Sequence, residues 1–132
     1  MDKGTVYKGF NKLLFDFLDD LSTLYPESKE IAQAKKTFSI FKSANPTILI
    51  KTWYSKIYVI YQKEIDSGDI SFFFNKDYSS DLKNVVGSDE IMNMIENIRQ
   101  PLKEMDATNR KHCSNYIIKL SKLSVMYQDL IK

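Results

Sequence analysis

The 132-residue sequence is poor in the residues that break helices and in those that cross-link chains. It holds four Gly, three Pro and one Cys, Cys113, so it cannot form an internal disulfide. A chain of this length buries enough apolar surface to fold without a disulfide or a metal. We therefore expect one domain over residues 1–132, with few turns, a reduced thiol and an intracellular setting. Residues 1–4 are expected to form a loose N-terminus.

Long apolar runs are also missing. The longest cover three or four residues, at 48–50, 58–61 and 72–74, whereas a membrane-spanning helix needs about 18 to 20. Residues 1–4 lack the apolar stretch of a signal peptide. These absences predict a protein that makes no membrane contact.

Arg is scarce as well, with two Arg against 17 Lys. The Lys excess accompanies 14 Ile and 17 aromatic residues against four Ala. Lys, Ile, Asn, Phe and Tyr are encoded by A/T-rich codons, so this bias indicates the composition of the source genome more than selection for a chemistry.

Residues that carry catalysis are few. The single His and Cys are neighbours, His112 and Cys113, and adjacent helical positions point about 100° apart, so they cannot act as a base and nucleophile pair. They are also too few for a zinc site, and the four scattered Gly form no phosphate-binding loop. We therefore predict a protein that is not an enzyme and has no catalytic residue, metal or cofactor. Asp16 and Asp20, four positions apart, are the carboxylates of an alternative metal-dependent enzyme.

Apolar residues recur at steps of three and four along most of the chain, the spacing of one helical face. Alternation with a period of two, as in a β-strand, is absent beyond a few residues. This pattern predicts an all-α, single-domain bundle of about five helices. The first expected helix starts near residue 6 and ends at Pro26, and the second starts at Glu27 or Ser28. The third runs from Asn45–Pro46 to the turn 66–69, and the fourth runs from Ser88 to Met105, where Pro101 either kinks it or splits it in two. The fifth is capped by Thr108 and runs to Leu130 or Ile131.

The central connection, residues 70–87, breaks this period and is rich in aromatic residues. Three consecutive Phe cannot all point into one small core, because neighbouring side chains diverge. At least one is therefore expected at the surface, where exposed apolar area commonly marks a partner site. The predicted protein-binding patch comprises Phe72, Phe73, Phe74 and Tyr78. In the alternative interpretation this segment closes the open end of the bundle.

The net charge of +2 conceals an uneven distribution. Residues 29–63 sum to +6, residues 63–90 to −4 and residues 99–132 to +4. The first stretch is the basis of an alternative function, nucleic-acid binding, in which Tyr54, Tyr58 or Tyr61 offers a stacking surface. The scarcity of Arg favours the plainer interpretation of solvated lysines. The lysines of this alternative site are Lys35, Lys36, Lys42, Lys51, Lys56 and Lys63.

Several short motifs occur in a characteristic order: Phe-Leu-Asp-Asp-Leu at 17–21, Tyr-Pro at 25–26, Phe-Phe-Phe at 72–74 and a final helix rich in Tyr and Leu. In this order the chain resembles small α-helical proteins of large nucleocytoplasmic DNA viruses, the giant and algal viruses. It departs from them at Asn115-Tyr116, where a Trp-Tyr pair is common.

The resemblance implies a viral accessory or virion-associated protein that acts in the host cytoplasm or the virion. Its partner would be a viral or host protein, and no catalytic role carries over. Together with the predicted patch, this favours a non-enzymatic protein that acts through protein contacts.

Overall fold

The computed structural model describes residues 2–68 and 105–131. The elements follow the order α1 (Lys3–Leu24), α2 (Lys29–Ala44), α3 (Ile48–Trp53), the π-helical turn η1 (Tyr54–Tyr58), α4 (Gln62–Ser67) and α7 (Ala107–Ile131). Every regular element in these ranges is helical, so the prediction of an all-α, single-domain bundle is confirmed.

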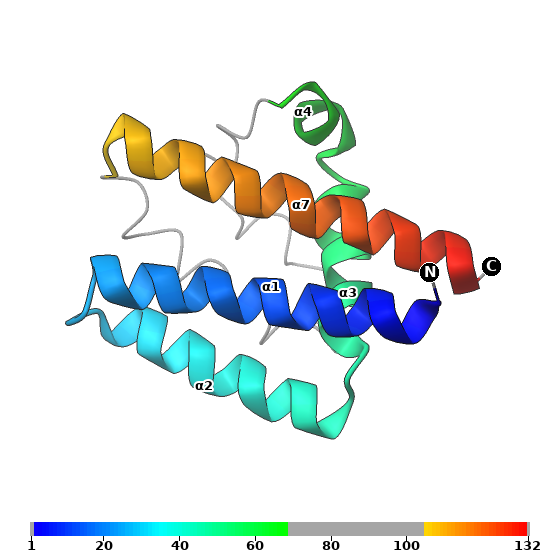
Figure 1. Ribbon diagram of the computed structural model, residues 1–132, viewed down its shortest axis with the longest axis horizontal. Coiled ribbons are helices and arrows are strands. Elements are labelled where there is room, and N and C mark those ends of the chain that lie inside the picture. The colour runs from blue at the N-terminus through cyan, green and yellow to red at the C-terminus, as the bar shows by residue number, and fades with distance from the viewer. Residues whose placement is uncertain (1, 69–104, 132) are drawn as a thin grey trace.

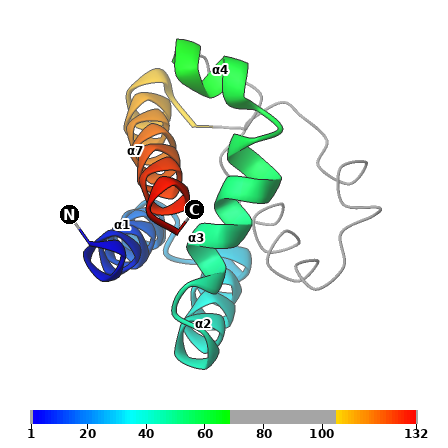
Figure 2. The same ribbon diagram turned by 90° about the vertical axis from the view of Figure 1, so that its right-hand side faces the viewer.

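Three long helices form a layer, with α1 between α7 and α2 and antiparallel to both (Figure 1). The segment from α3 to α4 crosses one side of this layer (Figure 2). The contact between α1 and α7 is the most extensive in the bundle. It brings the C-terminal half of α1 against the N-terminal half of α7, residues that are about 90 positions apart.

The core is made by the predicted apolar faces. In α1 the buried side chains include Val6, Phe10, Leu14, Phe17, Leu18 and Leu21, and in α2 they are Ile31, Ala34 and Phe38. In α7 they include Cys113, Ile117, Leu120 and Tyr127. The ring of Phe10 meets that of Trp53 edge to face, with 6.0 Å between centroids, so α3 is anchored on α1 near the centre of the layer.

Side-chain caps set the helix starts. Asp2 Oδ1 accepts a hydrogen bond from Thr5 N at 2.7 Å, so α1 already begins at Lys3 and the expectation of a loose N-terminus over residues 1–4 was wrong for residues 2–4. Ser28 caps α2 in the same way, and Ser28 is one of the two starts predicted for this helix. For α7, Asp106 accepts from Asn109 N at 2.8 Å, so the capping residue lies two positions before Thr108, the predicted cap, and the helix begins at Ala107.

The predicted third helix is divided. Asn45 Oδ1 accepts from Thr47 N at 3.1 Å, which makes a turn and delays the start of α3 to Ile48. Further along, Val59 N donates to Tyr54 O at 2.9 Å, a bond across five residues that defines the π-helical turn.

The spacing of the buried side chains explains this turn. Besides Ile50 and Thr52, the buried side chains follow every fourth residue: Leu49, Trp53, Ile57, Tyr61 and Ile65. An α-helix turns about 100° per residue, so each step of four drifts by about 40° from the core. The wider π-helical turn removes part of that drift, and all five side chains stay buried.

Three predictions fall outside the described residues: the aromatic connection 70–87, the helix from Ser88 as far as residue 104, and the effect of Pro101. Met105, which ends that predicted helix, is described and lies in the core at 6% exposure. Within residues 2–68 and 105–131, no helix combines the length and the apolar character needed to cross a membrane.

Candidate functional site

The predicted protein-binding patch, Phe72, Phe73, Phe74 and Tyr78, lies outside the described residues. It stays a prediction from the sequence.

The six lysines of the alternative nucleic-acid site are not brought together as one surface. Lys35, Lys36 and Lys42 lie on α2 and line a hollow against α1. The other three lie on different elements, with Lys51 on α3, Lys56 on η1 and Lys63 on α4.

Two of the α2 lysines already have partners in the chain. Lys35 Nζ forms an ion pair with Asp19, and Lys42 Nζ lies 4.6 Å from the centre of the Phe15 ring, a cation–π contact. The predicted stacking residue Tyr61 is only 3% exposed and offers no face to a base. Tyr54 and Tyr58 do stack, on each other, with 5.8 Å between centroids.

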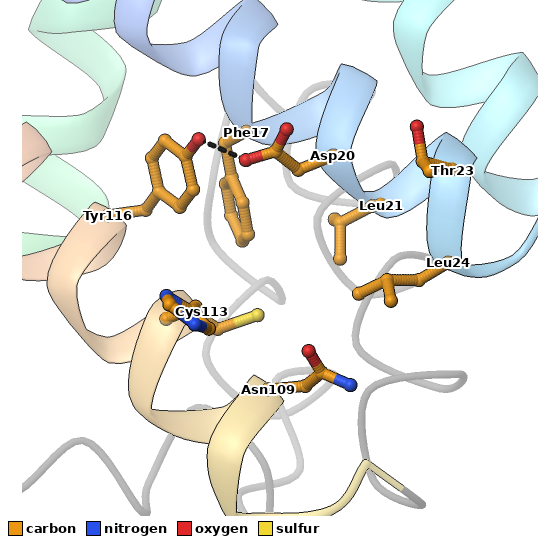
Figure 3. A pocket seen from close by; sticks show the side chains of 9 residues that line it. Phe17, Asp20, Leu21, Thr23, Leu24, Asn109, Cys113 and Tyr116 are labelled. Atoms are coloured by element: carbon orange, nitrogen blue, oxygen red, sulfur yellow. Dashed lines mark hydrogen bonds between the residues drawn. The ribbon is translucent and has the colours of Figure 1, made fainter.

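A pocket between α1 and α7 is lined by side chains of both helices. It has a volume of about 300 Å³ and combines apolar walls with a polar rim. Figure 3 shows Leu21 and Leu24 of α1 facing Cys113 and Asn109 of α7. Its lining residues are Phe17, Asp20, Leu21, Thr23, Leu24, Asn109, His112, Cys113 and Tyr116.

The helical period explains why these residues meet. Phe17, Leu21 and Leu24 follow at steps of four and three on α1, and Asn109, Cys113 and Tyr116 follow in the same way on α7. Each set lies on one face of its helix, and the antiparallel packing turns the two faces toward each other. Cys113 is small for a core residue, so space remains where a larger side chain would fill it.

The rim is organised by a bond between the two helices. The Tyr116 hydroxyl donates a hydrogen bond to Asp20 Oδ2, and the Tyr116 ring stacks on Phe17 with 4.9 Å between centroids (Figure 3). Because the phenol donates to a carboxylate, is partly buried and lies beside a negative charge, the pKa of Tyr116 is raised to about 12. At neutral pH this bond therefore joins a neutral phenol to Asp20.

The Cys113 thiol lies at the floor of the pocket and is 3% exposed. Burial, together with the negative charge of Asp20, raises its pKa to about 12. Its Sγ lies 3.5 Å from Met105 Sδ, so its surroundings are apolar. A thiol with this pKa is protonated at neutral pH and is not a nucleophile. The neighbouring His112 is exposed.

The two carboxylates of the alternative metal site have different partners. Asp16 pairs with Lys12 at 3.1 Å, and Asp20 accepts from Tyr116. The neighbouring Asp19 pairs with Lys35. In the described part of the chain, no group of three His, Cys, Asp or Glu side chains is placed to hold a metal ion.

Sequence reasoning had marked Asp20 and Cys113 separately but not the pocket that joins them. The available signal was the equal spacing of 17, 21, 24 and of 109, 113, 116 on two predicted helices. Comparison of the chain with protein families, with characterised proteins and with solved structures finds no match.

Proposed function

We propose that the protein acts without catalysis, by binding another protein at the pocket between α1 and α7. The observation that carries this proposal is a preformed cavity of about 300 Å³ with apolar walls, whose buried thiol is protonated at neutral pH. Concave, mostly apolar sites with a few polar groups are where proteins usually bind small ligands, and a single side chain of a partner protein has the size of such a ligand. The predicted patch at Phe72, Phe73, Phe74 and Tyr78 is a second contact surface in the same proposal.

The biological setting that we propose is viral. It rests on the resemblance to small helical proteins of giant and algal viruses, and the bias toward residues of A/T-rich codons supports it. In this proposal the protein is a viral accessory or virion-associated protein of the host cytoplasm or the virion, and its partner is a viral or host protein.

A matched pair of variants tests the binding site. Leu24 lines the pocket and is 43% exposed, whereas Leu130 lies near the end of α7, outside the pocket lining, and is 44% exposed. Tagged wild type, Leu24→Lys and Leu130→Lys are expressed in infected cells, and captured proteins are quantified by mass spectrometry. We expect one partner to be retained by wild type and Leu130→Lys and to fall at least tenfold with Leu24→Lys.

Both variants add the same charge at the same degree of exposure, so a general effect of charge cancels. Circular dichroism checks that the helical content is unchanged. Capture of the same partners in equal amounts by both variants would exclude the pocket as the binding site.

Nucleic-acid binding is the second candidate function. The observation in its favour is that Lys35, Lys36 and Lys42 line one hollow together with Tyr25. This candidate predicts a gel shift at low salt that weakens steeply toward physiological salt. Lys36→Gln should weaken the shift, whereas Lys63→Gln, on α4, should not. Absence of any shift at low salt would remove this candidate.

A further inference from the structure

The three carboxylates in the second half of α1 differ in their partners. Asp16 and Asp19 are each paired with a lysine of the chain, Lys12 and Lys35. Asp20, the one that lines the pocket, receives only the neutral hydroxyl of Tyr116 among the described residues. Its negative charge is therefore not balanced by a cation there.

The negative charge acts on the interior of the pocket. Asp20 contributes to the raised pKa of both Tyr116 and Cys113, which come from the opposite helix. Burial is the larger cause of the raised pKa of Cys113, and the hydrogen bond to Asp20 is the larger cause for Tyr116. In both groups the negative charge of Asp20 adds to the effect, because a second negative charge would lie close to the first. A cation entering the pocket would meet the opposite and favourable interaction.

The walls suit an alkyl chain. Leu21, Leu24 and the Cys113 side chain line the pocket together with Asp20, and the Phe17 ring lies beside the Asp20 carboxylate (Figure 3). A lysine has this combination of parts, since its four-carbon stem packs on apolar surface while the ammonium group stays at a polar edge.

The hydrogen bond of Tyr116 favours lysine over arginine. It occupies Asp20 Oδ2, and no side chain of residues 2–68 or 105–131 is hydrogen-bonded to Oδ1. A guanidinium group binds a carboxylate best through both oxygens, whereas an ammonium group makes a single-point contact.

We infer that the pocket between α1 and α7 receives a lysine side chain of the partner protein, with its stem on Leu21 and Leu24 and its ammonium group at Asp20. This inference rests on the proposed protein-binding function and names the chemistry of the partner.

The probe is Nα-acetyl-lysine methylamide, whose side-chain ammonium group is free. It is compared with its norleucine analogue, which keeps the alkyl stem and lacks the ammonium group. Binding to the full chain is followed by NMR through the backbone amides of Leu24 and Cys113. We expect the lysine probe to bind about fivefold more tightly than the norleucine probe, the upper range for an exposed ion pair. Asp20→Asn should abolish this preference and the matched control Asp19→Asn should keep it.

Equal affinity of the two probes, or no shift at Leu24 and Cys113 with either, would overturn the inference. In both cases loss of a partner with Leu24→Lys would still uphold the proposed function. A lysine preference that depends on Asp20, combined with unchanged partner capture by Leu24→Lys, would instead uphold lysine recognition and overturn the proposed function.

Discussion

Trp53 and Ser121 are joined by a buried hydrogen bond although 68 positions separate them in the chain. Trp53 Nε1 donates to Ser121 Oγ at 2.9 Å, and Ser121 Oγ donates in turn to Ile117 O at 2.8 Å. Trp53 is 4% exposed and Ser121 is fully buried. This short chain of bonds fixes α3 against α7 at the point where the two helices cross.

Trp53→Phe should lower the free energy of unfolding by about 1–3 kcal/mol, because it removes the donor and leaves a smaller ring in the core. Ser121→Ala should cost about 1 kcal/mol. Urea denaturation of wild type, both single variants and the double variant gives their coupling energy, which we expect to be about 1 kcal/mol. A coupling near zero would show that the hydrogen bond does not contribute to stability.

Two Gly→Ala substitutions should change stability in opposite directions. Gly9 lies within α1 with open space around it, so Gly9→Ala should stabilise the protein by about 0.5–1 kcal/mol. Gly68 follows α4 with φ of +84°, a left-handed conformation, so Gly68→Ala should destabilise it by about 1–2 kcal/mol. Thermal or urea unfolding of the two variants checks the signs. If both substitutions changed the free energy of unfolding in the same direction, the backbone conformation described for Gly9 or for Gly68 would be wrong.

The thiol of Cys113 should be unreactive in the folded protein. Its pKa of about 12 leaves little thiolate at pH 8, and the side chain is buried. We expect a chromogenic disulfide reagent to react roughly 100-fold more slowly with the native protein than with the protein in urea. Equal rates in the two states would place the thiol at the surface.

The Tyr116 phenol makes stability depend on alkaline pH. Its pKa rises from 10.0 to about 12 on folding, so between these values the folded state holds a proton that the unfolded state loses. The stability that this bond contributes is therefore complete below pH 10 and is lost as pH rises toward 12. We expect Tyr116→Phe to melt at a lower temperature at pH 8 and to lose less stability between pH 10 and 12. The control is Tyr54→Phe, outside the pocket, which should follow the wild type in its dependence on pH. If the melting temperatures of wild type and Tyr116→Phe fall in parallel between pH 10 and 12, the raised pKa of Tyr116 is contradicted.

Much of the fold was predictable because burial follows the helical period. Most of the apolar side chains predicted to face inward in 6–21 and 31–38 lie in the core, since each set occupies one face of its own helix. Leu13 is only partly buried. The exact starts were less predictable. Asp106 and Thr108 are both good capping residues, and only the geometry shows that Asp106 accepts from Asn109 N.

The pocket could not be derived from local pattern. Asp20 and Tyr116 are 96 positions apart, and their contact depends on how far α1 is shifted along α7. A shift by one turn, about 5.4 Å, would bring other residues together. The sequence indicates which face of each helix is buried, but it does not determine which residues meet across the interface.

The π-helical turn accommodates one extra residue in the chain. The segment from Leu49 to Ile65 holds one residue more than a regular α-helix needs to bury the same five side chains. Removal of the exposed Ser55 would change the burial steps to four, three, four and four, which an ordinary α-helix accommodates. This stretch is therefore where an insertion or deletion of one residue is best absorbed, because the helix can exchange a wide turn for a regular one and keep its core.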